Sequence, residues 1–248
     1  MKLGERMKTY EDVFNSFMTR RTPVIIRLDG CHFHTVTKGF DKPFDTGMEY
    51  AMCATMANLC RNVQGCVLGY TQSDEITLVL CDYKKLDSDA WFRNRVQKIC
   101  SVSASMASVS FMKALHSYAE TMKDYVEQLE KYAKVIDNGV CFDARCFNLP
   151  KEEVCNNLIW RQQDATRNSV QALAQSLYPH KELHGIGCNA LQDKIYREKG
   201  VNWNDLPTSQ KRGVCAIMDG NGWILDYDIP IFTQNRSYID DRIMFEEE

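Results

Sequence analysis

The sequence predicts an α+β fold of ferredoxin-like type, in which residues 23–147 follow the order β-α-β-β-α-β. Two observations lead to this prediction. Short runs rich in β-branched residues alternate with longer segments of helical periodicity, and two of the strands are joined only by the turn QSD. The chain has 248 residues, of which 44% are hydrophobic, so it is long enough to bury a sizeable core.

The predicted elements follow one another closely. In order they are strand 23–29, helix 45–62, strands 66–71 and 75–81, helix 88–118 and strand 140–147. Asp45 suits the N-cap of the first helix, whose apolar residues recur at helical spacing from Met48 to Leu59. The second helix has serines on its predicted inner face, which indicates a close approach to the sheet; that face comprises Phe92, Val96, Ile99, Ser103, Met106 and Ser110.

The pattern changes after residue 148. Pro150 suits the start of a long helix over 151–178, and a short helix is expected near 189–199. GVCAIMDGNGWILDY predicts a β-hairpin that turns at DGNG. We therefore predict a core over 1–148 and, over 149–248, a C-terminal helix with a small α/β extension that packs on this core as one unit.

The composition excludes several classes of protein. No run of about 18 uncharged apolar residues predicts a membrane span, and the charged N-terminus lacks the apolar core of a secretion signal. The 11 cysteines form no C-x-x-C motif and are typical of reduced thiols, so we expect a cytoplasmic protein. A net charge of −3 excludes a basic surface field over the whole molecule and leaves only local basic clusters.

Two acidic motifs stand where strands are predicted to end. RLDGCHFH at 27–34 contains Asp29, and GYTQSDEITLVL at 69–80 contains Asp74 and Glu75. A right-handed crossover makes the first two strands parallel, and the third strand runs back between them. The end of the first strand then lies at the same sheet edge as the turn after the second, with neighbouring strands about 4.8 Å apart. Asp29 and Asp74 should therefore lie side by side.

Two neighbouring carboxylates repel each other, so a shared proton, a lysine or a metal ion must offset the repulsion. Oxygen ligands at an open edge suit Mg²⁺, and two such ions would activate an attacking hydroxyl and stabilise a leaving pyrophosphate. Gly30 would offer its carbonyl to the metal, and the N–H groups from Cys31 to His34 would cradle phosphates. This is the layout of a nucleotidyl-transfer palm.

Two other interpretations of these motifs stay open. Asp-Gly after a strand and Ser-Asp in a hairpin are both ordinary turn chemistry. Cys31, His32 and His34 stand close together and can ligate zinc, but a zinc site needs about four ligands and the sequence offers no obvious second half.

The two motifs, in this order and spacing, resemble those of the tRNA-histidine guanylyltransferase family and its guanylyltransferase-like relatives, which are 3′-to-5′ nucleotide-adding polymerases. The similarity extends to WFRNRVQKICSVSASMAS, FDARCF and WRQQDA; it is clear over 20–165 and weak over 185–213. It implies that residues 1–148 form a palm-like catalytic domain.

The resemblance also implies roles for individual residues. Asp29, the Gly30 carbonyl and Asp74 would hold two Mg²⁺ ions, and Glu75 would support them from behind. Lys42 and Asp45 would act in the first chemical step, and Arg95 and Lys98 would bind a second triphosphate. Lys194 and Asn202 are implied more weakly as RNA or nucleotide contacts. The residues implied to bind the nucleotide are Asp29, Gly30, Cys31, His32, Phe33, His34, Ser73 and Asp74.

The chemistry that the resemblance implies has two stages. ATP first adenylylates the 5′-monophosphate of a tRNA and releases pyrophosphate. The 3′-hydroxyl of an incoming nucleotide such as GTP then attacks this phosphate and expels AMP, whereas a 5′-triphosphate end can skip activation. Positioning and charge neutralisation are the protein's share. Relatives form tetramers, so the resemblance also implies a homo-oligomer.

Two departures from the family pattern matter. Members specific for histidine tRNA carry a His-Ile-Asn-Asn tetrad just after the WRQ stretch, where this sequence has Thr166, Arg167, Asn168 and Ser169. This loss favours the guanylyltransferase-like branch, whose members add templated nucleotides and repair 5′-truncated tRNAs. Cys31 replaces a residue that is commonly basic, so one phosphate or base contact is in doubt.

Two competing functions remain. A nucleotide cyclase shares the palm and its metal carboxylates but needs no RNA surface. An RNA-binding module of RRM type has the same element order but needs exposed aromatic residues on the sheet, and Phe142 and Phe147 are expected on opposite faces.

Overall fold

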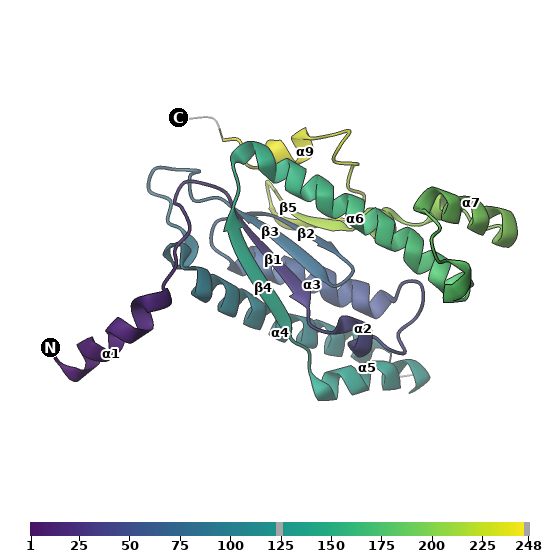
Figure 1. The fold of residues 1–248 in the computed structure, drawn as a ribbon, viewed down its shortest axis with the longest axis horizontal. Coiled ribbons are helices and arrows are strands. Elements are labelled where there is room, and N and C mark those ends of the chain that lie inside the picture. The colour runs from purple at the N-terminus through teal and green to yellow at the C-terminus, as the bar shows by residue number, and fades with distance from the viewer. Residues whose placement is uncertain (123–125, 246–248) are drawn as a thin grey trace.

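A six-stranded antiparallel sheet forms the centre of the computed structural model, which describes residues 1–122 and 126–245 (Figure 1). The strand order is β4-β1-β3-β2-β5-β6. The strands are β1 (Val24–Gly30), β2 (Cys66–Gln72), β3 (Glu75–Leu80), β4 (Phe142–Asn148), β5 (Val214–Asp219) and β6 (Gly222–Asp226).

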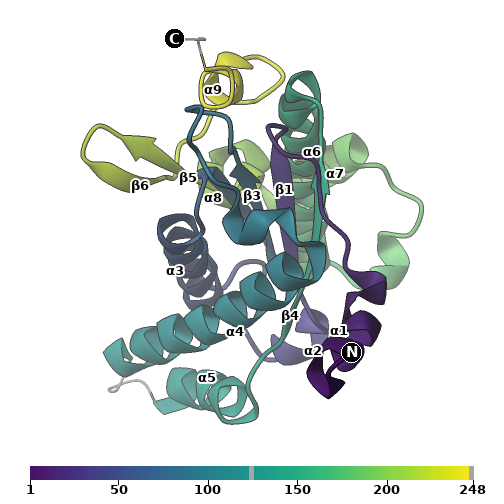
Figure 2. The ribbon, with the colours of Figure 1, turned by 90° about the vertical axis from the view of Figure 1, so that its left-hand side faces the viewer.

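Helices cover both faces of this sheet, with α3 and α4 on one side and α6 on the other (Figure 2). The described helices are α1 (Leu3–Glu11), α2 (Phe33–Val36), α3 (Thr46–Asn62), α4 (Val96–Thr121), α5 (Val126–Asn138), α6 (Lys151–Leu177), α7 (Cys188–Lys199), α8 (Thr208–Arg212) and α9 (Ser237–Asp240). No described helix is long and apolar enough to span a membrane.

The alternation of side chains along the strands divides the core between the two faces. Ile26 and Leu28 of β1 are fully buried against α3 and α4, together with Met52, Met56 and Phe111. Ile25, which precedes Ile26 and points to the opposite face, packs with Val154 and Leu158 of α6. This period of two also places Arg27 and Asp29 on the α6 face.

The predicted fold is confirmed. Strand β3 pairs with both β1 and β2, and β4 pairs with β1, which gives the expected order β4-β1-β3-β2. The predicted C-terminal hairpin forms β5 and β6, and β5 pairs with β2 so that the hairpin continues the sheet. The division at residue 148 stays a prediction.

The predicted boundaries of the second long helix were wrong at its start. Helix α4 begins at Val96 rather than at residue 88 because Phe92, Arg93 and Asn94 have positive φ angles of 48°, 56° and 62°, which a helix cannot accommodate. Its inner face is as expected at Ile99 and Ser103, which are fully buried.

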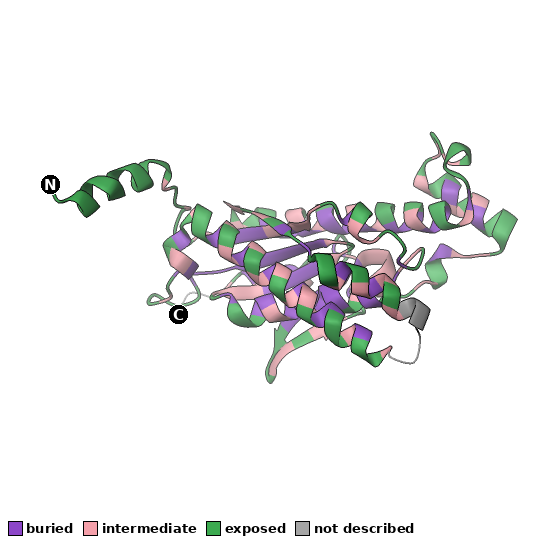
Figure 3. Ribbon diagram, turned by 90° about the horizontal axis from the view of Figure 1, so that it is seen from below, coloured by how far each residue is buried: buried purple, intermediate pink, exposed green. Residues whose placement is uncertain are grey.

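Five of the described helices were not predicted from the sequence: the longer helices α1 and α5 and the short helices α2, α8 and α9. Helix α5 packs against the α3–α4 core through Tyr132 and Val135. Helix α1 makes no such contact, because every one of its residues is exposed and it projects from the body of the protein (Figure 3).

Candidate active site

The two acidic motifs meet at one edge of the sheet, as the topology predicts. Asp29 at the end of β1 is the direct cross-strand neighbour of Glu75 at the start of β3. The Gly30 N–H donates a hydrogen bond to the Asp74 carbonyl over 3.0 Å, which joins the end of β1 to the β2–β3 turn. Both aspartates therefore belong to the same rigid corner of the sheet.

The carboxylates of Asp29 and Asp74 have no cationic partner within ion-pair distance among the described residues. Burial raises the pKa of Asp74, and the nearby charge of Asp29 raises it further, although the Ser73 hydroxyl donates to Asp74 over 3.0 Å. Two repelling oxygen donors at an open edge fit Mg²⁺, which takes one or two carboxylates and completes its shell with water and phosphate. Cys31, His32 and His34 are not part of any described cluster of metal-binding side chains, so the zinc interpretation gains no support.

Glu75 contrasts with these two aspartates because its charge is fully matched. Arg161 of α6 donates from Nε and Nη2 to the two Glu75 oxygens over 2.7 and 2.8 Å. Arg27 of β1 lies 2.7 Å from the same carboxylate. Glu75 and Arg161 are each 3% exposed, so Glu75 is a buried residue behind the acidic edge rather than a group that touches substrate.

The segment predicted to cradle phosphates is partly used by the fold itself. A Cβ on Gly30 would lie 2.3 Å from the Phe33 ring, so this glycine admits Phe33 to the core rather than a phosphate to the backbone. Phe33 is 3% exposed and packs against Phe111 and Phe142. Its ring is therefore held mainly in the core. Phe142 is likewise buried, which removes one aromatic residue that an RRM-type surface would need.

Cys31 also differs from its predicted role. Its N–H donates to the Cys141 carbonyl over 2.9 Å and is therefore not free for a phosphate. Burial, and then the charges of Asp143 and neighbouring groups, raise the pKa of the Cys31 thiol, which stays protonated and neutral near pH 7.

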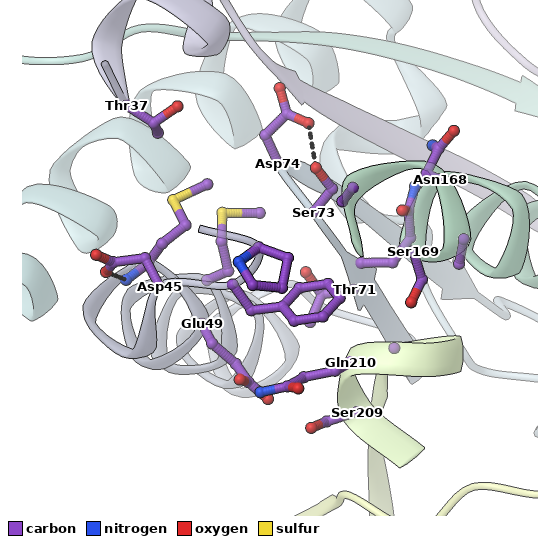
Figure 4. Close-up of a pocket in the computed structure, with 18 of the residues that line it drawn as sticks. Thr37, Asp45, Glu49, Thr71, Ser73, Asp74, Asn168, Ser169, Ser209 and Gln210 are labelled. Atoms are coloured by element: carbon purple, nitrogen blue, oxygen red, sulfur yellow. Dashed lines mark hydrogen bonds between the residues drawn. The ribbon is translucent and has the colours of Figure 1, made fainter. Parts of the chain in front are cut away.

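A cavity of about 370 Å³ opens beside the acidic edge and has the size of a small-ligand site (Figure 4). The predicted site residues that line it are Phe33, His34, Lys42, Asp45, Ser73 and Asp74. Sequence reasoning missed other lining residues: Glu49 of α3, Thr71 of β2, Asn168 and Ser169 of α6, and Ser209 and Gln210 of α8. Figure 4 shows Glu49 and Gln210 on one wall and Asp74 across the cavity from them.

Asp45 lines this cavity, but its carboxylate oxygens are already bound by other groups of the protein. It is the N-cap of α3, as predicted, and accepts hydrogen bonds from the Met48 and Asp41 N–H groups over 3.0 and 2.9 Å. Tyr132 and Lys131 of α5 bind the same carboxylate at 2.9 and 3.1 Å. Burial alone would raise the pKa of Asp45, but these hydrogen bonds outweigh it and lower the pKa.

We expect Asp45→Ala to destabilise the protein by about 2 kcal/mol at pH 7, because it removes a cap and leaves buried donors unpaired. A carboxyl group with a lowered pKa in the folded state stabilises the protein above its unfolded pKa of about 4, and this contribution is lost as the pH falls. Urea unfolding should therefore show a difference in the free energy of unfolding between wild type and Asp45→Ala that is smaller in acid than at pH 7. Thr46→Ala, at the neighbouring exposed position, is the control. If wild type and Asp45→Ala differed in free energy of unfolding by the same amount at both pH values, this explanation would be contradicted.

The structure does not bring all predicted site residues together. Arg95 and Lys98 stand at the start of α4, where the Val96 carbonyl contacts the Cys146 thiol, so they lie toward the opposite end of the strands from Asp29. Lys194 lies on α7 with its charge shared by Glu182 and Glu198, each 3.6 Å away. Asn202 caps the turn after α7 by accepting from the Asn204 N–H.

Palm-type nucleotidyltransferases combine a sheet of this topology with paired carboxylates at one edge. The family model of tRNAHis guanylyltransferase matches residues 4–150, which is more than half of the chain. The chain therefore belongs to the tRNAHis guanylyltransferase family, whose members are nucleotidyltransferases.

Individual curated proteins are also similar to this chain over most of its length. Uncharacterized protein R259 of Acanthamoeba polyphaga mimivirus is 30% identical over 223 residues, which is 86% of this chain and 75% of the relative. A probable tRNA(His) guanylyltransferase of Drosophila melanogaster is 27% identical over 207 residues, which is 78% of this chain and 66% of the relative.

A solved bacterial tRNA(His) guanylyltransferase (Thg1)-like protein in complex with ATP is 41% identical, with a TM-score of 0.87 over 99% of this chain and 100% of that one. A second bacterial structure of this description, in complex with GTP, is 36% identical with a TM-score of 0.78 over 98% and 100% of the two chains. The tRNA(His) guanylyltransferase of Saccharomyces cerevisiae has the same fold, with a TM-score of 0.68 at 22% identity over 94% and 100%.

Proposed function

We propose that the protein adds nucleotides to the 5′ end of tRNA in the 3′-to-5′ direction. The observation that carries this proposal is the pair of unneutralised carboxylates, Asp29 and Asp74, at one edge of the sheet, where Asp74 also lines the cavity. The bacterial relatives that hold ATP and GTP support the same choice of substrates.

The residues around this edge divide the work. Asp29 and Asp74, with the Gly30 carbonyl, would hold magnesium, which when bound neutralises phosphate charge and eases loss of the proton from an attacking hydroxyl. Ser73 orients Asp74 through its hydrogen bond, and the exposed side chains of His34 and Lys42 stand where they can contact phosphate groups. Arg95 and Lys98 stay predictions for a second triphosphate.

In the proposed reaction each step breaks one phosphoanhydride bond: the first forms a new phosphoanhydride between AMP and the tRNA 5′-phosphate, and the second forms the new phosphodiester bond. A 5′-phosphate oxygen of the tRNA attacks the α-phosphorus of ATP, and pyrophosphate leaves. The 3′-hydroxyl of the incoming nucleotide then attacks the activated 5′-phosphorus, loses its proton and displaces AMP. The fixed positions of the carboxylates lower the barrier by holding the attacking and leaving oxygens in line.

We infer that the protein carries out templated repair of truncated 5′ ends rather than addition of a single guanylate. The histidine-specific tetrad is absent, and Ser169, which stands in its place, accepts a hydrogen bond from the Trp203 indole over 3.0 Å and is buried. Its hydroxyl therefore has a structural partner within the protein. Action on tRNA in the cytoplasm and assembly as a homo-oligomer stay predictions.

The test is an extension assay with purified protein, Mg²⁺, ATP and the four nucleoside triphosphates. A tRNA that lacks its 5′-most nucleotide should gain the residue complementary to the opposite strand, and changing that template base should change the residue added. Addition of G alone, to histidine tRNA alone, would contradict templated repair. Failure to extend even a 5′-triphosphorylated tRNA, together with cyclisation of ATP or GTP, would identify a cyclase instead.

A further inference from the structure

We propose that Arg161 of α6 is a positioning residue for the acidic edge, because it fixes the β2–β3 turn, and with it Asp74, through Glu75. The inference rests on the proposed function, since the position of Asp74 matters to catalysis only if this carboxylate takes part in nucleotidyl transfer.

The contact between Arg161 and Glu75 has a defined geometry. Nε of Arg161 lies 2.7 Å from Glu75 Oε1 and Nη2 lies 2.8 Å from Oε2, so the guanidinium fork holds both oxygens at once. Arg27 adds a third contact of 2.7 Å to Oε2. The side chains of Glu75 and Arg161 are each 4% exposed, so water cannot replace either partner.

Glu75 transmits this constraint to the catalytic edge. It follows Asp74 in the chain and is the cross-strand neighbour of Asp29. Its carbonyl accepts a hydrogen bond from the Thr71 hydroxyl over 2.8 Å, on the other side of the same turn. A shift of the Glu75 side chain would therefore carry the turn, and the Asp74 carboxylate, away from Asp29.

Arg161 also ties the edge to the wall of the cavity. It donates a further hydrogen bond to Asp164 over 2.8 Å, one turn along α6, and Asn168 of the cavity wall follows one turn beyond. The same guanidinium group therefore sets the position of α6 relative to Asp74. In Figure 1, α6 begins beside the end of β4 and crosses the sheet toward α7.

A role in stability alone does not account for this arrangement. A buried ion pair is commonly no more stabilising than apolar side chains of similar volume, although removal of one partner leaves a costly unpaired charge. Because Arg27 also contacts Glu75, replacing Arg27, Glu75 and Arg161 together removes the whole charged cluster and should leave the fold intact. A positioning role then predicts that metal binding stays impaired when stability is restored, whereas a purely structural role predicts that both recover together.

The experiment compares Arg161→Met, Arg161→Lys and the triple variant Arg27→Met/Glu75→Gln/Arg161→Met with wild type. Thermal unfolding reports stability, Mn²⁺ titration followed by electron paramagnetic resonance reports the metal site without turnover, and single-turnover extension reports catalysis. We expect Arg161→Met to lower the unfolding temperature and to weaken Mn²⁺ binding at least about tenfold. The triple variant should recover the unfolding temperature but not the Mn²⁺ affinity, and Arg161→Lys should lie between wild type and Arg161→Met.

The matched control is Arg20→Met. Arg20 lies 2.8 Å from Asp82, another buried carboxylate, which follows the far end of β3. This variant should also lower the unfolding temperature, with Mn²⁺ affinity and the extension rate unchanged. Recovery of both stability and Mn²⁺ affinity in the triple variant, or an equal loss of affinity in Arg20→Met, would overturn the positioning role. A wild-type protein that extends no RNA and whose Mn²⁺ binding is insensitive to Asp74→Asn would overturn the proposed function, and the positioning role with it.

Discussion

Asp29→Asn and Asp74→Asn are each expected to lower the rate of 5′-end extension by about 1,000-fold or more. Each change removes one of the two anionic oxygen donors at the sheet edge, and the loss of metal-assisted charge stabilisation costs several kcal/mol in the transition state. The measurement is single-turnover extension of a 5′-triphosphorylated tRNA, which bypasses activation and isolates the transfer step.

Folding provides the check on this prediction. Because the charge of Asp29 raises the pKa of Asp74, removal of either charge relieves repulsion. Without metal, each variant should be as stable as wild type or slightly more stable. We expect its free energy of unfolding to rise by no more than on the order of 0.5 kcal/mol. Asp143→Asn is the matched control, since Asp143 faces Asp29 from β4 but is exposed and paired with Arg145 at 3.2 Å. An equal loss of activity in Asp143→Asn would mean that the overall negative charge of this sheet edge, rather than the Asp29–Asp74 pair, supports the reaction.

Gly30→Ala is expected to have the largest effect on stability, about 3 kcal/mol or more. The new methyl group would lie 2.3 Å from the Phe33 ring, which is held in the core by Phe111 and Phe142. Relief requires that this ring or the end of β1 move, and overpacking of a close-packed core commonly costs 1–3 kcal/mol and occasionally more. Urea unfolding measures the loss, and extension activity should fall with it because Asp29 precedes this glycine.

Gly220→Ala serves as the control, because no atom lies within 4 Å of the position that its Cβ would take. Its free energy of unfolding should change by less than about 0.5 kcal/mol. If Gly30→Ala were as mild as Gly220→Ala, the close approach of Phe33 would not explain the presence of glycine at this position.

The meeting of Asp29 and Asp74 was predictable because it follows from strand order alone. The alternation of strands and helices fixes which strands are neighbours, and the chirality rule fixes their directions. The sheet edge at which both motifs end can then be predicted without any knowledge of side-chain packing. The N-cap at Asp45 was predictable for a similar reason, since capping depends on a few adjacent residues.

The cavity was not predictable in the same way. Glu49, Asn168 and Gln210 come from three elements that are far apart in the sequence, and none carries a local signal of its role. Packing also decides the use of a side chain: Phe33 and Asp45 lie in the predicted segments, yet one is a core residue and the other a helix cap. Arg161 had no visible role until the structure placed it against Glu75.

The continuation of the sheet through β5 has a consequence for how the protein folds during synthesis. The Tyr70 hydroxyl donates to the Arg212 carbonyl, and these residues are 142 positions apart in the chain. Until the ribosome has released residues beyond β5, the outer edge of β2 has no partner, and unpaired strand edges are prone to aggregation. Such distant pairing also slows folding. Nascent chains that stall after β4 should therefore depend on chaperones, and α8, which supplies one wall of the cavity, can join only after Arg212 has left the ribosome.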